Sequence, residues 1–412
     1  MANISFSGIV IHGKKLWRTI GYPTANISLE KWNVDDGVYS LNITVSDATY
    51  RWVGTYRENI SLFEAHIFDF DADIYGELVK ICIHERIRDN HNFDSIESLK
   101  IQIHKDTQKA KWETTYPTLD TIVLQTLDLY QTQEKLPKLD LNIFKTPLVV
   151  WSGNGYYTGR ILFRNLGAFF ATESEINEKL ANIPTITDVV VISASGEKHA
   201  PIILNTAIEY HKNTFLISSS EKSSGRDIAN SSIIMPKIRE PYTYNTSTYF
   251  GYMLAENPYL DLEKLKRFIL EDFQITIKDI NFSDYSSFFI VLPDEFVLLR
   301  EMLEVKFIEL FGRKVAHDTF TYEQMKHATT VVQDENELFL CFGNKIWIQY
   351  GNNQINLPIF DITHYAAMML VGYTLVGKIQ KSLSPYFMES IQDYCIRAKT
   401  QSGFSITPWV EV

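Results

Sequence analysis

The chain has 412 residues, of which 45% are hydrophobic and 22% are charged, a composition typical of a globular protein with two or three domains. The formal net charge of −11 argues against a nucleic-acid partner, because affinity for the phosphate backbone depends on clustered Lys and Arg. The longest apolar stretch, from Ala366 to Gly377, is shorter than the about 20 residues that cross a bilayer. Since the N-terminus also lacks a signal-peptide pattern, we expect a cytoplasmic protein without a membrane partner.

Short segments of alternating apolar and polar residues fill the chain up to about residue 90. This period of two is typical of strands, and it recurs in residues 5–13, 37–45, 49–56, 64–70 and 78–87. Strands spaced this closely predict a small antiparallel barrel. A helix follows, which Asp94 opens with Glu97 three residues later, and it closes the domain near Ala110.

From about residue 120 the pattern changes to apolar strands that alternate with helical stretches, and it starts again at Ser286. Apolar runs of this kind are suited to parallel strands that are buried on both faces. The predicted fold class is therefore multidomain, with a small antiparallel β-barrel and its C-terminal helix followed by a three-layer α/β part with parallel sheets. The predicted segments are residues 1–115 for the barrel domain, 116–145 for a helical linker, 146–258 for a first α/β subdomain and 259–412 for a second.

The segment WRTIGYPTANI, residues 17–27, places several turn residues directly behind the first predicted strand. Gly21 permits a close approach of a ligand, and Thr24 and Asn26 point the same way if the segment is extended. Two neutral oxygens on one face form half a shell for Mg²⁺, which prefers oxygen ligands and commonly shares its site with substrate phosphates. By themselves, these residues equally fit an ordinary proline turn.

Residues 5–110 resemble riboflavin kinase, the module that transfers the γ-phosphate of ATP to the ribityl 5′-hydroxyl of riboflavin. The resemblance rests on the PTAN tetrapeptide at 23–26 and on the pattern E-x-H-x-x-D-F-x-x-D-x-Y-G at 64–76. It implies that Thr24 and Asn26 bind Mg²⁺ and the nucleotide phosphates, and that Glu64 is the base toward the ribityl hydroxyl. The residues that it assigns to nucleotide or flavin are Arg18, Gly21, Thr24, Asn26 and Arg88.

Two departures from the family pattern leave an alternative open. Trp17 stands where the family usually has glycine, and the N-x-G-x-x-P-T-F segment between the third and fourth strands is absent. A barrel that binds flavin without phosphorylating it is therefore a second interpretation of this domain.

Serine clusters follow three of the apolar strands in the α/β part. Small hydroxyl residues between a strand and a helix N-terminus form anion sites, and open α/β sheets bind ligands at the carboxyl ends of their strands. Residues 120–400 resemble the double sugar-isomerase (SIS) fold of phosphoglucose isomerase and of the isomerase half of glucosamine-6-phosphate synthase. The segments that carry this resemblance are SGNGYYTGR at 152–160, DVVVISASGEK at 188–198, REPYTYNTSTY at 239–249 and the helical K-x-x-E at 306–309.

This second resemblance implies a phosphosugar isomerase and a homodimer formed through this part of the chain. Glu309 would be the base that moves a proton between C1 and C2, and His327 would open the sugar ring. The residues implied to hold the sugar phosphate are Ser152, Ser193, Ser195, Lys198, Thr248 and Lys306.

Other interpretations of the same residues remain open. Lys306 and Glu309 also fit a surface ion pair at i,i+3 spacing, and His327 also fits the end of a helix. The α/β part would then bind a sugar phosphate or a nucleotide without turnover, as a sensor or dimerisation module for the kinase.

Overall fold

The computed structural model describes residues 4–12, 24–28, 34–45, 48–57, 62–67, 74–91, 93–113, 116–151, 155–343, 348–402 and 406–410. Contacts divide the chain into two compact units, residues 1–117 and 118–412. The finer predicted boundaries, at residues 145 and 258, stay predictions. Within the described residues, no helix is both long enough and apolar enough to span a bilayer.

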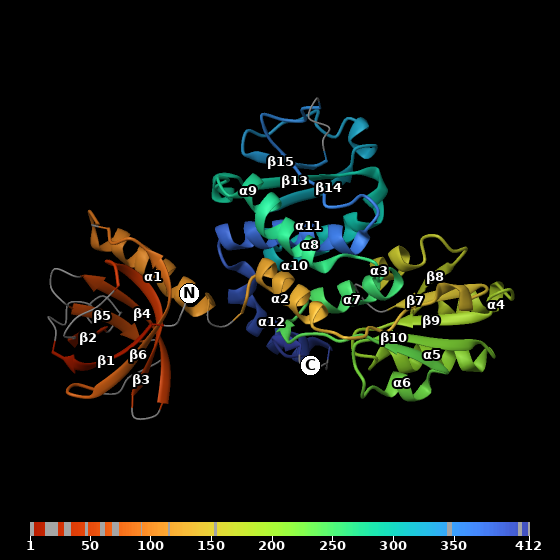
Figure 1. Ribbon diagram of the computed structural model, residues 1–412, viewed down its shortest axis with the longest axis horizontal. Helices are drawn as coiled ribbons and strands as arrows, with labels where there is room; N and C mark the ends of the chain where they lie inside the picture. Colours follow the sequence, from red (N-terminus) through yellow and green to blue (C-terminus); the bar gives the residue numbers. More distant parts are fainter. Residues whose placement is uncertain are drawn as a thin grey trace. The chain divides into compact units, whose positions relative to one another are not determined.

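The first unit is a closed barrel of six antiparallel strands in the order β1-β2-β5-β4-β3-β6 (Figure 1). Alternate residues along the strands fill its core, and the largest of them, Trp52 and Phe63, are fully buried. The predicted barrel is therefore confirmed. The strands are β1 (Ile4–Ile11), β2 (Thr24–Ser28), β3 (Gly37–Val45), β4 (Ala48–Arg57), β5 (Leu62–Ile67) and β6 (Leu78–Arg88).

Helix α1 (Ile96–Glu113) follows the barrel and packs against β3 and β4. The prediction that Asp94 opens this helix was wrong by one residue. Ser95 caps it instead, because its Oγ accepts a hydrogen bond of 3.1 Å from the backbone N–H of Ser98.

The second unit contains two parallel sheets. The first has the order β11-β10-β9-β7-β8 and the second has the order β14-β13-β15-β16. Numbered within each sheet along the chain, both follow the order 2-1-3-4, and the first adds a fifth strand. The predicted restart of the α/β pattern thus appears as a repeated strand order, and the predicted parallel sheets are confirmed. The strands are β7 (Pro147–Trp151), β8 (Phe169–Thr172), β9 (Asp188–Ile192), β10 (Asn213–Ser218), β11 (Ser231–Ile234), β13 (Ser287–Leu292), β14 (Ala316–Thr321), β15 (Glu337–Phe342) and β16 (Asn353–Leu357).

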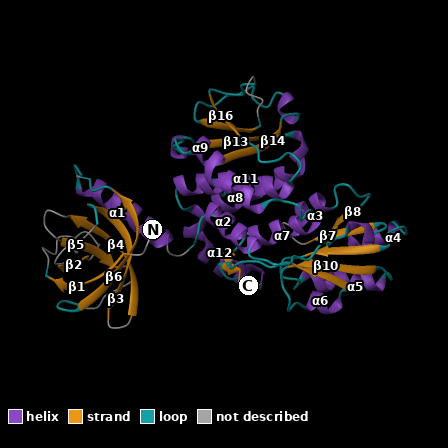
Figure 2. Ribbon diagram, in the orientation of Figure 1, coloured by secondary structure: helices purple, strands orange, loops and turns teal. Residues whose placement is uncertain are grey.

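Helices of the second unit gather in a layer between its two sheets (Figure 2). The apolar stretch from Ala366 becomes α11, which is buried along most of its length and packs against α2, α7 and α10. A Cβ at Gly377 would lie 2.1 Å from the backbone nitrogen of Asp120, so the closest crossing of α11 and α2 requires glycine. These helices are α2 (Leu119–Gln131), α7 (Thr246–Glu256), α10 (Arg300–Phe311) and α11 (Tyr365–Ser382).

The remaining helices are α3 (Gly155–Leu162), α4 (Ile176–Asn182), α5 (His199–Glu209), α6 (Ser224–Ile228), α8 (Leu262–Phe268), α9 (Gln274–Ile277) and α12 (Tyr386–Ser402). Of these, α3 packs against α7, α8 packs against α2, and α5 packs against β9 and β10. A further two-stranded pairing joins β12 (Glu240–Pro241) to β17 (Trp409–Val410). The guanidinium of Arg239 lies 4.2 Å from the ring centroid of Trp409, beside this pairing.

Candidate functional sites

In the barrel, Asn26 and Glu64 are direct partners in the antiparallel ladder of β2 and β5. Paired residues share a face of the sheet, so their side chains lie next to each other. This face is opposite to the barrel core, since the neighbouring residues Ala25, Ile27, Phe63 and Ala65 are core residues. Asn26 is nevertheless only 7% exposed, and Glu64 is half-buried. The amide of Asn26 and the carboxylate of Glu64 therefore lie side by side at a partly buried position.

The structure describes the other predicted residues of the first loop only in part or not at all. Thr24 begins β2 and is the ladder partner of His66, but its side chain lies outside the described structure. Arg18 and Gly21 lie outside the described residues altogether.

Arg88 stands at the end of β6 and forms an ion pair with Asp106 of α1. Its Nε lies 2.9 and 3.0 Å from the two carboxylate oxygens, and its Nη2 lies 2.6 Å from Oδ2. Nη1 donates to the carbonyl oxygen of Asp89 at 2.8 Å, and the guanidinium lies 5.7 Å from the ring centroid of Phe93. These contacts tie the helix to the barrel, and a flavin contact by Arg88 stays a prediction.

In the second unit, the predicted phosphate loop joins β9 to α5. Ser193 Oγ accepts a hydrogen bond of 3.1 Å from the N–H of Gly196, and Ser195 Oγ accepts one of 3.3 Å from the N–H of Glu197. Both oxygens act as acceptors here, so both hydroxyl hydrogens can be donated to an anion. Ser152, from the neighbouring loop after β7, lies outside the described residues.

The loop packs closely against the start of α6. Gly196 has φ of +66°, and a Cβ there would lie 2.4 Å from Ser223 Oγ. The Glu197 carboxylate accepts hydrogen bonds from the Ser224 N–H, at 2.9 Å, and from its hydroxyl. The hydrogen bonds from Ser224 lower the pKa of Glu197, so the loop carries a stable negative charge. Lys198 is exposed at the end of this loop.

Lys306 and Glu309 form a buried ion pair on α10 and not a surface pair. Lys306 is 1% exposed, and its Nζ lies 2.6 Å from Glu309 Oε2. The same Nζ donates to the carbonyl oxygen of Thr243 and lies 5.5 Å from the ring centroid of Tyr373. Thr243 has a positive φ of 77°, an uncommon conformation for a β-branched residue. The loop before α7 is thus held to α10 through the ammonium group.

Glu240 is a second buried carboxylate beside this pair, and the sequence analysis did not single it out. Its Oε2 accepts from the N–H of Thr246 at 2.8 Å, and its Oε1 accepts from the N–H and hydroxyl of Ser247 at 3.3 and 2.7 Å. Burial raises the pKa of Glu240, and these hydrogen bonds act in the opposite direction. It caps the first turn of α7 from six residues away, a spacing that no capping pattern describes.

Two further predicted residues lie apart from these groups. Thr248 is buried in the first turn of α7. His327 follows a short 3-10 turn, Gln324–Lys326, after β14, and it is exposed. Among the contacts of the described residues, none joins His327 to Glu309 or to the loop after β9.

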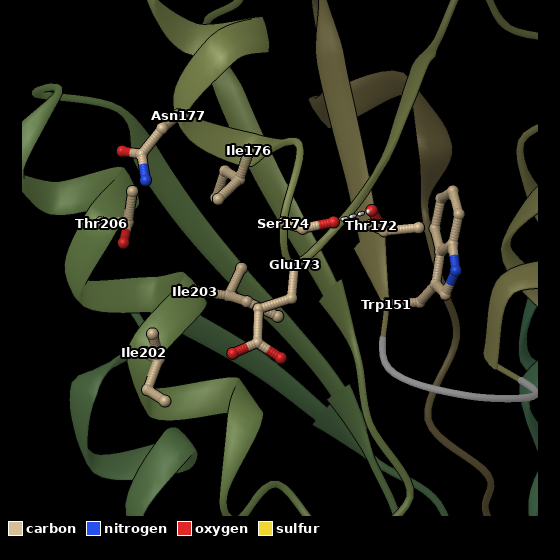
Figure 3. A pocket seen from close by; sticks show the side chains of 9 residues that line it. All are labelled: Trp151, Thr172, Glu173, Ser174, Ile176, Asn177, Ile202, Ile203 and Thr206. Atoms are coloured by element: carbon tan, nitrogen blue, oxygen red, sulfur yellow. Dashed lines mark hydrogen bonds between the residues drawn. The ribbon is translucent and has the colours of Figure 1, made fainter.

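A cavity of about 480 Å³ lies at the carboxyl ends of β7 and β8, beside α4 and α5 (Figure 3). None of the described residues predicted to hold a sugar phosphate lines it. Its lining residues are Trp151, Thr172, Glu173, Ser174, Ile176, Asn177, Ile202, Ile203 and Thr206. The cavity is therefore a different place from the serine loop, and no sequence pattern indicated it.

Residues 1–113 match the model of the Flavokinase family, which is described as riboflavin kinase. The bifunctional riboflavin kinase/FMN adenylyltransferase of Haemophilus influenzae is 41% identical over 112 residues, which cover 25% of this chain and 36% of the relative. Its counterpart from Bacillus subtilis is 38% identical over 114 residues, with the same two shares. The chain thus spans about a third of the length of these curated relatives. The predicted resemblance to riboflavin kinase is confirmed for residues 1–113.

Among solved structures, glucosamine-6-phosphate deaminase of Thermotoga maritima aligns with 65% of this chain and 94% of its own length. The identity is 14% and the TM-score is 0.47. The fold of residues 118–412 is therefore defined by its two parallel sheets alone, and the resemblance to sugar isomerases stays a prediction.

Proposed function

We propose that the barrel unit is a riboflavin kinase that transfers the γ-phosphate of ATP to the ribityl 5′-hydroxyl of riboflavin and releases FMN and ADP. The observation that carries this proposal is the pairing of Asn26 with Glu64 across one ladder, within a barrel that matches the flavokinase model. The family match covers the barrel alone, so the activity of the whole protein is part of the proposal.

Phosphoryl transfer requires few protein groups. The hydroxyl oxygen forms a bond to the γ-phosphorus, the bond from that phosphorus to the β-phosphate oxygen breaks, and Glu64 accepts the hydroxyl proton. Phosphoryl transfer depends mainly on alignment and on neutralising the phosphate charge. Glu64 supplies the carboxylate for this proton transfer, and it is half-buried beside the amide of Asn26.

Mg²⁺ is the expected metal, and the chemistry of the donor set fits it. Asn26 offers an amide oxygen beside the catalytic carboxylate, and Mg²⁺ is commonly held by one or two protein oxygens together with substrate phosphates. Asn26 would hold the ion together with Thr24, as the family resemblance implies. When bound, the ion would neutralise charge on the β- and γ-phosphates.

The test is the formation of FMN by the full-length protein from riboflavin, ATP and MgCl₂. We expect saturable product formation, and a fall of about 10²–10⁴-fold in kcat with Glu64→Gln. The control is Glu97→Gln, because Glu97 is an exposed residue of α1 and should leave the rate unchanged. A protein that binds riboflavin but forms no FMN would instead support the flavin-binding interpretation.

A second function is proposed for the α/β unit, namely binding of a phosphorylated sugar at the loop after β9. Two observations support it. Ser193 and Ser195 present hydroxyl groups at the carboxyl edge between β7 and β9, where a 2-1-3-4-5 sheet changes direction and such folds bind ligands. The ammonium group of Lys306 positions the carboxylate of Glu309 at 2.6 Å, and a positioned carboxylate is the group that proton transfer between C1 and C2 requires.

Binding and turnover can be separated by experiment. The full-length protein is incubated in D₂O with fructose 6-phosphate and with glucosamine 6-phosphate, and deuterium incorporation at C1 and C2 is followed by NMR. Incorporation that Glu309→Gln abolishes would support isomerisation. Binding without incorporation, lost on combining Ser193→Ala with Ser195→Ala, would support the sensor. A homodimer and a cytoplasmic location stay predictions, and sedimentation equilibrium tests the first.

A further inference from the structure

The cavity beside β7 and β8 has the size and construction of a small-ligand site. Its volume of about 480 Å³ lies within the range of about 300–1,000 Å³ that is usual for such sites. Three separate segments line it, namely the loop from β8 to α4, the first turn of α4 and one face of α5 (Figure 3).

The floor of the cavity is apolar. Its accessible part is Ile202 of α5, which is 55% exposed, whereas Ile176 of α4, Ile203 of α5 and Trp151 of β7 are buried. The indole of Trp151 is itself packed, with its ring centroid 4.0 Å from that of Tyr156. Such a floor can receive the C–H face of a ligand, but it offers little open aromatic surface for stacking a flat ring.

The rim is polar, and it contains donors as well as acceptors, because Asn177 and Thr206 carry N–H and O–H groups. Thr172 donates its hydroxyl hydrogen to Glu175 Oε2 at 2.7 Å, so the 3.0 Å contact between Thr172 and Ser174 must use the hydrogen of Ser174. The lone pairs of Ser174 are then directed to other partners. Glu173 adds a carboxylate, which lies against His199 at the start of α5. A ligand with several hydroxyl groups, each of which can both donate and accept, matches this rim.

The lining offers no cationic side chain to a phosphorylated ligand. None of the nine lining residues is Lys or Arg, and the one acidic residue among them, Glu173, lies against His199. Neutral hydroxyl groups can donate hydrogen bonds to that carboxylate.

We propose that this cavity binds a neutral polyhydroxylated compound, such as an unphosphorylated sugar or a polyol. The site is separate from the serine loop after β9, and it does not depend on the function proposed for that loop. The ligand lays its C–H face on Ile202, which is 55% exposed, and donates its hydroxyl hydrogens to Glu173 and Ser174.

The test uses saturation-transfer NMR on the full-length protein with two probes, D-fructose and D-glucitol, at concentrations up to about 10 mM. Ile202→Arg places a long side chain in the cavity from a residue that is 55% exposed on α5. The matched control is Ile208→Arg, on the same helix, 42% exposed and outside the lining. Riboflavin binding and the melting temperature check that each variant is folded.

We expect saturable binding of at least one probe. Ile202→Arg should raise the dissociation constant about tenfold or more, which corresponds to about 1.4 kcal/mol, and Ile208→Arg should leave it unchanged. Glu173→Gln should weaken binding less, because the amide retains one acceptor. Combining Ser193→Ala with Ser195→Ala should leave it unchanged. Three results would overturn the proposal: no binding of either probe, equal effects of the two arginine variants, or loss of binding with the serine variants.

Discussion

In the barrel, Asn26 and Glu64 face each other across one antiparallel ladder, whereas the candidate residues of the second unit come from a loop, two helices and a turn. Strand register fixes the first pair through backbone hydrogen bonds, so residues far apart in sequence meet without help from other side chains. In the second unit, Lys306 needs the carbonyl of Thr243 and the carboxylate of Glu309 to be held in place. The barrel site thus depends on main-chain geometry, and the second depends on buried side-chain contacts.

This difference predicts that a change in the barrel ladder alters activity more than stability. Asn26→Leu should lower kcat/KM for FMN formation by about 10²–10³-fold and raise the Mg²⁺ concentration that is needed, because one oxygen ligand is lost. Leucine has the same branching and the same number of side-chain heavy atoms as asparagine, and it replaces a polar group at a nearly buried position, so the melting temperature should change little. An unchanged Mg²⁺ requirement would contradict the role proposed for Asn26.

A change in the buried pair should have the opposite effect. Lys306→Met leaves the Glu309 carboxylate and the Thr243 carbonyl without the ammonium group, and should lower the unfolding free energy of the second unit by about 3 kcal/mol. Chemical denaturation, followed by near-ultraviolet circular dichroism, measures this. FMN formation should be unaffected in the absence of denaturant, and its loss would show that the two units are coupled.

The ion pair of Arg88 and Asp106 tests whether side-chain contacts also stabilise the barrel unit. Arg88→Leu should lower the unfolding free energy of that unit by about 2 kcal/mol, because three charged hydrogen bonds to a nearly buried carboxylate are lost. A thermal melt is compared with the KM for riboflavin. If stability is unchanged while KM rises, Arg88 binds flavin and does not fasten α1.

Glu323 and Lys326 provide the matched control for the buried pair. They have the same i,i+3 spacing and a nitrogen–oxygen distance of 2.7 Å, but the lysine side chain is 67% exposed. Lys326→Met should therefore change the unfolding free energy by less than about 0.5 kcal/mol. A cost close to that of Lys306→Met would mean that burial does not decide the strength of these pairs.

Most strands were predicted because their apolar patterns reflect the faces that they bury. The strands β8 and β16 were missed, and both lie at the edge of a parallel sheet. An edge strand is covered less than a central one, so FFAT and NQINL lack the long apolar run that identifies β9 or β13. The strand β2 was described only as a segment that would be extended, since five residues with two polar ones give a weak period.

The candidate site residues likewise differ in whether the sequence could predict them. Asn26 and Glu64 could be named from sequence because a motif preserves spacing along two neighbouring strands. The burial of Lys306 could not, since a Lys and a Glu three apart on a helix give the same pattern whether solvent or Tyr373 lies beside them. Glu240 and the cavity beside β8 depend on segments that are brought together only by folding.

The pairing of β12 with β17 has a consequence for how the protein is made. Glu240 is the ladder partner of Val410, and the N–H of Tyr242 donates to the carbonyl of Pro408 at 2.8 Å. The ribosome releases residues 240–256 long before residue 410, so α7 leaves the exit tunnel while the edge of β12 still lacks its partner strand. Domains generally fold as units during synthesis, and this one can be completed only after its last strand emerges. The six strands of the barrel lie between residues 4 and 88, so that sheet can form much earlier in synthesis.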